Sequence, residues 1–157
     1  MKIKLILLGK TDEAWLHSGI EEYRIRVNRY IPFEIVEIPS QKNQVSLSHP
    51  ELKMKESQSV ERYIRQGDVV VLLDERGKEM RSVGFAGFLN KYFVSGAKNL
   101  VFVVGGAFGF DESFKNKASF ILSLSQMTFS HQMVRLFFTE QLYRALTILK
   151  GELYHHE

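Results

Sequence analysis

The fold is decided by residues 100–124, which read LVFVVGGAFGFDESFKNKASFILSL. Two short apolar runs in this stretch, Leu100–Val104 and Phe120–Leu124, have the length and the β-branched or aromatic content of buried strands. The first run ends in the glycine-rich segment Gly105–Gly109, and the second ends in Ser125–Phe129. Ligands of open α/β sheets bind at the carboxyl ends of strands, so we predict a ligand site where these two segments meet.

The rest of the chain alternates between strand and helix patterns. Strands are predicted at 3–8, 33–38 and 68–74, and the last, DVVVLLD, is a continuous aliphatic run typical of a parallel strand covered on both faces. Helices are predicted at about 12–30, 50–65, 82–93, 111–117 and 131–150. This order predicts one three-layer α/β domain over residues 1–157, with a mainly parallel five-stranded sheet.

Several element boundaries depend on single residues. Thr11 or Asp12, Ser82 and Asp111 are expected to cap helices, and Pro50 suits a first helical turn. Residues 75–78 are expected to turn away from the end of the third strand, and residues 41–48 are expected to form a polar loop. Trp15 is expected on the buried side of the first helix.

Composition excludes several classes of protein. With 157 residues and 45% hydrophobic content, the chain can bury a proper core. No apolar run approaches the roughly 20 residues of a membrane span, and the apolar start of the chain lacks a signal-peptide cleavage site. Cysteine is absent, which excludes disulfides and thiolate metal sites and fits a cytoplasmic protein. A net charge of +3 permits a nucleic-acid partner without arguing for one.

The last predicted helix carries more apolar residues than one buried stripe requires. Its apolar positions, including Phe137, Leu146 and Leu149, spread around the helix. A homodimer would cover the second face, although a helix sunk deep in its own core has the same pattern. We favour the dimer because the chain is short.

Charged and aromatic side chains near the end of the chain suggest further roles. His131 and Arg135 lie at the head of the last helix, and Glu140 and Arg144 have the spacing of an ordinary helical ion pair. Tyr154, His155 and His156 form a tail that is either frayed or part of a site; no third ligand is spaced to make the histidines a metal site. Earlier in the chain, Arg24, Arg26 and Arg29 indicate a solvated helix face more strongly than an RNA contact.

The two loops favour an adenine-sized ligand. Gly105–Gly109 has neither the GxGxxG spacing of dinucleotide-binding proteins nor the lysine of a P-loop. The loop from Leu124 to Phe129 has no glycine and mixes apolar and hydroxyl side chains, which suits a ligand held by main-chain hydrogen bonds between apolar walls. A flavodoxin-like or dinucleotide-binding enzyme is therefore disfavoured.

These residues resemble the small SPOUT-class methyltransferases, which methylate N3 of a pseudouridine in large-subunit ribosomal RNA. The similarity is carried by VFVVGGAFGF, LSLSQMTFSHQMVRLFFTEQLYRALTI, the ending YHH and the start MKIKLILLGK. It implies a trefoil knot, a homodimer and S-adenosylmethionine as methyl donor. The residues that it assigns to the cofactor are Leu73, Gly105, Leu124, Ser125, Gln126, Met127, Thr128 and Phe129. Where the family usually has proline, this chain has Ser130, which can cap the helix instead.

The reaction implied by this resemblance requires that the methyl donor and the acceptor be held in line, and that one group accept a proton. Methyl transfer is an in-line displacement, and the acceptor nitrogen must lose its proton. His155 and His131 are the candidate bases, Tyr154 is expected to stack on or hydrogen-bond the base, and Arg135 is expected to contact phosphate or the imide oxygens. The low net charge favours the assembled ribosome as substrate over free RNA. The alternative is a dimeric RNA-binding module without chemistry.

Overall fold

A computed structural model describes residues 1–40 and 46–156, so most of the polar loop predicted at 41–48 lies outside the described residues. The strands are β1 (Lys2–Leu8), β2 (Phe33–Ile38), β3 (Val69–Glu79), β4 (Asn99–Val104) and β5 (Phe120–Ser123). The helices are α1 (Ala14–Val27), α2 (His49–Glu61), α3 (Ser82–Ser95), α4 (Glu112–Lys117) and α5 (Met133–Lys150). Within this described part, the strands form one sheet in the order β2-β1-β4-β3-β5, with parallel pairings throughout.

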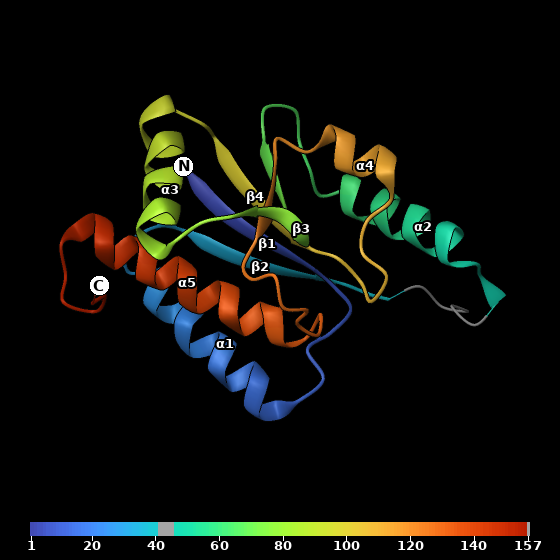
Figure 1. The fold of residues 1–157 in the computed structure, drawn as a ribbon, viewed down its shortest axis with the longest axis horizontal. Helices are drawn as coiled ribbons and strands as arrows, with labels where there is room; N and C mark the ends of the chain where they lie inside the picture. The colour runs from blue at the N-terminus through green and yellow to red at the C-terminus, as the bar shows by residue number, and fades with distance from the viewer. Residues whose placement is uncertain (41–45, 157) are drawn as a thin grey trace.

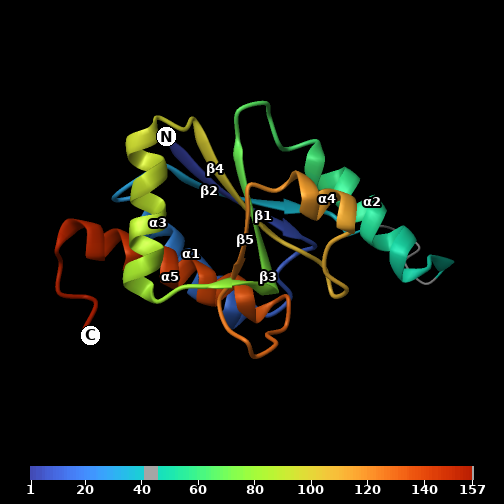
Figure 2. The same ribbon diagram turned by 45° about the horizontal axis from the view of Figure 1, so that its top comes forward.

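The helices cover both faces of the sheet. Helices α1, α3 and α5 lie on one face, and α2 and α4 lie on the other (Figure 1). The view in Figure 2 shows the same separation into layers. The predicted three-layer α/β fold with a parallel five-stranded sheet is confirmed. The trefoil knot stays a prediction.

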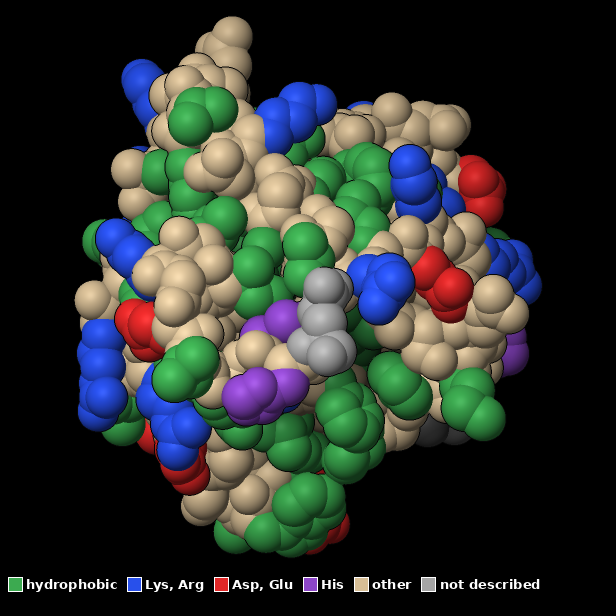
Figure 3. All heavy atoms as spheres, turned by 60° about the vertical axis from the view of Figure 1, so that its left-hand side comes forward, with side chains coloured by type: hydrophobic (Ala, Val, Ile, Leu, Met, Phe, Trp, Pro, Cys, Tyr) green, Lys and Arg blue, Asp and Glu red, His purple; other side chains and the backbone are tan. Residues whose placement is uncertain are grey.

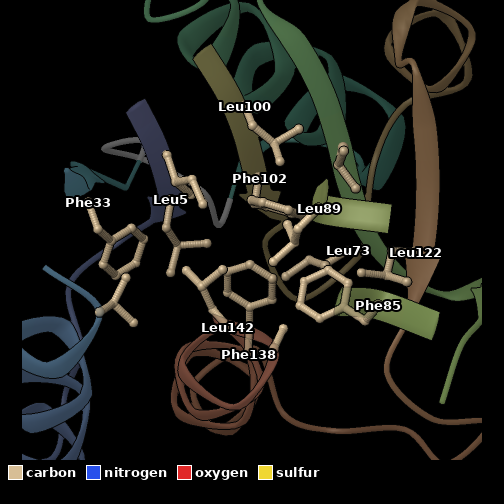
Figure 4. Close-up of a cluster of buried hydrophobic side chains, with 14 of the residues drawn as sticks. Leu5, Phe33, Leu73, Phe85, Leu89, Leu100, Phe102, Leu122, Phe138 and Leu142 are labelled. Atoms are coloured by element: carbon tan, nitrogen blue, oxygen red, sulfur yellow. The ribbon is translucent and has the colours of Figure 1, made fainter. Parts of the chain in front are cut away.

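The larger core lies between the sheet and the layer of α1, α3 and α5. Phe102 of β4 and Phe138 of α5 are fully buried, with ring centroids 4.6 Å apart, and Phe85 of α3 packs edge-on against Phe102 (Figure 4). On the opposite face, Val101 and Val103 pack in a second core with side chains from α2 and α4. Burial on both faces explains why β4 is apolar without alternation. No helix in the described ranges is long and apolar enough to cross a bilayer.

The predicted turn after Asp74 is wrong. Strand β3 continues to Glu79, with a shift of register against β5 between Leu73 and Lys78. Gly77 lies in this irregular part, where a Cβ atom would come within 2.7 Å of the main-chain carbonyl group of Ile121. Glycine is needed there because two backbones approach closely, a contact between distant segments that local sequence does not reveal.

The start of α1 also differs from the prediction. The helix begins at Ala14 and its N-cap residue, Glu13, makes no side-chain cap bond. Thr11, one of the two expected caps, accepts a hydrogen bond from Arg135 instead. Trp15 is 60% exposed, and Leu16 is buried in its place. Ile20 and Val27 on the same helix are buried, so the wrong prediction concerns Trp15 and not the whole helix face.

The predictions for the starts of α2 and α4 are confirmed, and the prediction for the start of α3 is wrong. Asp111 caps α4 by accepting from the Phe114 amide, and Pro50 lies in the first turn of α2 behind a capping box between Ser48 and Glu51. Ser82 does not cap α3: it is the first helical residue, and its hydroxyl donates to Gln141 Oε1 at 2.9 Å. Tertiary contact with α5 thus replaces the expected local contact.

Helix α5 occupies the middle of its layer, between α1 and α3 (Figure 1). Leu136 packs so closely on α1 that a Cβ atom at Gly19 would lie 3.1 Å from its Cδ1. Much of the surplus apolar surface of α5 is therefore buried within the chain itself. Phe137 and Leu149 remain 41% and 37% exposed. The surplus of apolar residues on α5 is therefore weaker support for a homodimer than the sequence alone suggested.

The close approach at Gly77 predicts a large effect of a single methyl group. Gly77→Ala should lower the free energy of unfolding by about 1–3 kcal/mol, because the main chain of β5 has to move. Gly87→Ala is the matched control, since nothing lies within 4 Å of that Cβ position in α3. It should be neutral or stabilise the helix by up to ~1 kcal/mol. Equal urea midpoints for Gly77→Ala and the unsubstituted chain would contradict the close approach.

Candidate active site

A cavity of about 530 Å³ lies at the carboxyl ends of β3, β4 and β5. Most of its wall comes from three segments at the ends of these strands: residues 73–76, residues 104–110, and most of residues 122–131. Lys53 of α2, Glu112 and Lys115 of α4, and Val134 of α5 complete the lining. The sheet order brings these segments together, because β3 lies between β4 and β5. The site predicted at adjoining strand ends is therefore a real cavity, of the size of a small-molecule site.

Most of the side chains assigned to the cofactor line this cavity. They are Leu73, Gly105, Leu124, Ser125, Met127, Thr128 and Phe129. Gln126 is not among the lining residues, and its Nε2 donates to Glu79 Oε2 at 3.3 Å. That contact with the extended end of β3 gives Gln126 a role in holding the loop in place.

The loop after β5 is shaped by its own hydrogen bonds. Ser123 Oγ donates to the Ser125 carbonyl at 2.8 Å, and the Met127 amide donates to Ser125 Oγ at 3.0 Å. Thr128 Oγ1 donates to Glu75 across the cavity mouth. At the far end, Ser130 Oγ accepts from the Met133 amide at 3.1 Å, although the N-cap residue of α5 is Gln132. Ser130 thus satisfies a free amide of the first turn, as predicted for the position where the family has proline.

His131 is the one candidate base at the cavity. Burial lowers its pKa, the neighbouring positive charge of Arg135 lowers that pKa further, and Asp12 opposes both. The imidazole is therefore neutral at pH 7, and a neutral imidazole can accept a proton.

The structure gives Arg135 a different role from the one expected. Its guanidinium is fully buried and donates to the carbonyls of Leu8, Gly9 and His131 and to Thr11 Oγ1, at 2.8–3.1 Å. All of these partners belong to the chain itself, and Arg135 is not a cavity-lining residue. In this structure the guanidinium is therefore not offered to phosphate or to a base. It joins the end of β1 to the start of α5.

The C-terminal tail is folded back on α1 and α5. Tyr154 Oη donates to Glu140 at 3.0 Å and lies 3.2 Å from Tyr23 Oη. Glu140 also binds the Arg144 guanidinium, which confirms the predicted helical pair, and that guanidinium lies 4.7 Å from the Tyr154 ring. Burial, followed by the hydrogen bonds to Tyr23 and Glu140, raises the pKa of Tyr154. The tail has defined contacts and a neutral phenol.

His155 lies beside the same arginine. Its Nδ1 is 3.5 Å from Arg144 Nη1, and its Nε2 is buried without a hydrogen-bond partner in the described part of the chain. A guanidinium can only donate, so Nδ1 is the acceptor of this contact. In the space-filling view, histidine side chains lie near the middle of the face that carries the C-terminus, between hydrophobic side chains (Figure 3).

The segment before α5 and the tail after it lie at opposite ends of the helix (Figure 1), and only the first of these segments lines the cavity. The helix has 18 residues, so roughly 27 Å separates His131 from the residues that follow Gly151. Within one chain the structure therefore brings His131 to the cavity and does not bring Tyr154 or His155 there.

The arginines of α1 favour the solvated-face interpretation. Arg24 binds Glu21 and Arg26 binds Glu22, each within the helix. These ion pairs account for two of the three charges that suggested an RNA contact.

A family model described as predicted SPOUT methyltransferase matches residues 1–155. The chain belongs to the SPOUT methyltransferase family. A Parabacteroides distasonis protein named ribosomal RNA large subunit methyltransferase H is 51% identical over 157 residues, which is 100% of both chains. A Geobacter protein of the same name is 45% identical over 157 residues, with the same coverage. A solved structure of a probable methyltransferase from Bordetella pertussis has a TM-score of 0.59 at 12% identity, covers 92% of this chain and 94% of its own, and supports the fold alone.

SPOUT methyltransferases take their methyl group from S-adenosylmethionine. The cavity fits this cofactor in three respects. Its volume is that of a small-ligand site, backbone at Gly105 and Gly106 lines it without side chains, and Leu73, Leu124 and Phe129 supply apolar walls.

The buried position of Arg135 predicts a stability effect. Arg135→Gln removes the donors for the Leu8 and Gly9 carbonyls and should lower the free energy of unfolding by about 2–4 kcal/mol. Arg29→Gln, in the exposed turn after α1, is the matched control and should stay within about 0.5 kcal/mol of the unsubstituted chain. Urea denaturation measures both. An Arg135→Gln variant of normal stability would return Arg135 to the list of substrate-contacting residues.

Proposed function

We propose that this SPOUT methyltransferase transfers a methyl group from S-adenosylmethionine to N3 of a pseudouridine in large-subunit ribosomal RNA, within the assembled ribosome in the cytoplasm. The observation that carries the proposal is the cavity at three adjoining strand ends, with His131 at its wall. The names of full-length relatives at 45–51% identity support ribosomal RNA as the substrate class. The resemblance described above supports the base and the atom.

The residues of the chain have two tasks in this reaction: they hold the donor in line with the acceptor, and they accept a proton. The bound cofactor supplies an electrophilic methyl group on a sulfonium. The wall at Leu73, Gly105 and Leu124 holds the donor in line with the acceptor. Holding the two reactants in this geometry lowers the activation barrier of the transfer. A neutral histidine, His131 or His155, takes the N3 proton of the pseudouridine. The positive charge of the bound donor favours the anionic form of the nucleobase that results.

A second copy of the chain is part of the proposal because one copy holds the two halves of the site apart. In a two-fold dimer whose axis is perpendicular to α5, the two α5 helices pack antiparallel, and the tail of one subunit then lies beside the cavity of the other. The exposed Phe137 and Leu149 give α5 an apolar surface for that contact. Tyr154 and His155 would then act on the base bound at the partner's cavity.

The ribosome as substrate is supported by charge. Affinity for free RNA comes largely from neutralised phosphates, and this chain has a net charge of only +3. Contacts with other parts of the assembled ribosome would supply the binding affinity that the low net charge does not. Methylation assays on intact ribosomes and on protein-free RNA, read by mass spectrometry of the modified nucleotide, test both the substrate and the atom. Ribosome binding without S-adenosylmethionine binding would favour the non-catalytic module.

Cofactor binding is tested at Gly105. Its Cβ position is 3.1 Å from the Phe110 ring and its backbone lines the cavity, so Gly105→Val should weaken S-adenosylmethionine binding at least tenfold by crowding the wall. Gly87→Val, on an exposed and uncrowded face of α3, is the control and should bind normally. Isothermal titration calorimetry gives both affinities. Equal affinities would move the cofactor away from this cavity.

Completion of the site by a second subunit is tested by mixing two inactive variants. Deletion of residues 153–157 removes the tail, and Gly105→Val weakens cofactor binding, so each homodimer should be nearly inactive when the S-adenosylmethionine concentration is kept well below the dissociation constant of the Gly105→Val variant. A mixed dimer contains one intact cavity facing one intact tail, and we expect methylation to return to about a quarter of the unsubstituted rate after random exchange, because half of the dimers are mixed and each has one of two sites.

Two results would contradict that arrangement. If the tail acted on the cavity of its own chain, no subunit of a mixed dimer would have both parts and the mixture would stay inactive. If the truncated protein alone were fully active, the tail would have no part in the reaction. Sedimentation of the mixture, with one variant tagged, verifies that mixed dimers have formed.

A further inference from the structure

Glu56 is a buried carboxylate behind the cavity wall. It lies on α2, is only 7% exposed, and its Oε2 has no hydrogen-bond partner among residues 1–40 and 46–156. The carboxylate lies against Gly106: a Cβ atom there would be 2.7 Å from Oε1 and 2.8 Å from Oε2. Gly106 is part of the cavity wall, so a single glycine separates this carboxylate from a ligand. Glycine at 106 is what allows the approach.

The other carboxylates around the cavity have partners. Asp74 pairs with Lys115 at 3.6 Å, Glu112 contacts the same lysine at 3.4 Å, and Glu75 accepts from Thr128. Glu56 forms no ion pair within the described ranges. Glu56 is thus the carboxyl group of this wall that has no partner in the described ranges, while Lys53 and Arg76 place positive charge elsewhere on the cavity lining. Burial raises the pKa of the Glu56 carboxyl group, so its charged form gains most when a cation is bound close to it.

A buried charge without a partner is costly, and a cation placed nearby removes that cost. The cofactor of the proposed function is such a cation, since S-adenosylmethionine carries a sulfonium and a net charge of +1. The product, S-adenosylhomocysteine, has the same adenosine and amino acid parts, a neutral thioether and no net charge.

We propose that Glu56 is the counter-charge that makes the cavity distinguish the sulfonium donor from its thioether product. The inference rests on the proposed function, because it concerns the same cavity. In the reaction the C–S bond breaks as the methyl group bonds to N3, the electron pair stays on sulfur, and the N3 proton goes to the base. The sulfur loses its charge, so the attraction to Glu56 ends and the product leaves for a new donor.

The expected size of the effect follows from the attraction between two unit charges separated by the cavity wall. Two unit charges roughly 10 Å apart interact by on the order of tenfold in affinity at the effective dielectric constant of a protein interior. Glu56→Gln keeps the size and polarity of the side chain and removes only the charge. It should weaken S-adenosylmethionine binding about tenfold and change S-adenosylhomocysteine binding by less than about twofold.

Calorimetric titration of the full-length protein with each ligand is the experiment. Glu61→Gln is the matched control: the same helix, the same substitution, and a carboxylate already paired with Lys117. It should leave both affinities unchanged. Glu56→Gln should also unfold at the same temperature or higher, because an unpaired buried charge is removed. Glu56→Met, neutral and similar in volume, gives the same comparison if Glu56→Gln does not fold.

The ratio of the two affinities decides the outcome. A selective loss for the donor supports the counter-charge. An equal loss for both ligands would show that Glu56 only supports the wall at Gly106, and no loss would show that its charge does not reach the ligand; either result overturns the inference and leaves the proposed function standing. If the unsubstituted protein bound neither ligand, the proposed function itself would fail, and this inference with it.

Discussion

The site depends on a buried arginine that joins two distant parts of the chain. Arg135 donates to the carbonyls at the end of β1 and to the His131 carbonyl, so it fixes the start of α5 against the sheet. Gln132 adds to this junction, accepting from the Asp12 amide and donating to the Lys10 carbonyl. Since His131 and the loop before it depend on where α5 begins, one guanidinium determines the geometry of one wall of the cavity. Catalytic geometry requires supports of this kind, because small displacements of a reacting group reduce the rate.

The direction of α5 separates the cavity from the C-terminal tail. Its first turn belongs to the cavity and its last turn belongs to the tail, which is held through Glu140, Tyr154 and Tyr23. Tyr30 adds a bond to Glu152, which raises the pKa of Tyr30 to about 12. A tail with so many contacts to its own chain is preorganised, and it therefore loses little conformational entropy on meeting a substrate. Preorganisation far from the cavity is useful when the substrate lies between two subunits, and a frayed tail would have no need of it.

Sequence predicted the parts of this protein that depend on local pattern. Continuous aliphatic runs gave β3 and β4, and the residues after them gave the cavity, because the carboxyl ends of parallel strands meet at one edge of the sheet. It failed where distant segments decide the structure. The extension of β3 depends on pairing with β5, and the burial of Arg135 depends on the carbonyls of β1. Tyr23 contacts Tyr154 of the tail although the two residues lie far apart in the sequence. An arginine near a helix start has no local signal that separates a structural guanidinium from one that binds a substrate.

Glycine illustrates the same limit inside the cavity. Gly77 and Gly106 both look like turn residues in the sequence, yet main chain of β5 crowds one and the Glu56 carboxylate crowds the other. The first contact serves the fold, since an uncharged main chain simply packs there. The second brings a charge to a wall where it lowers stability and contributes nothing to packing that a neutral side chain could not. Sequences usually agree with their folds at every level, and departures concentrate at functional sites. A costly carboxylate behind a glycine, at a wall that a cationic donor would touch, is such a departure.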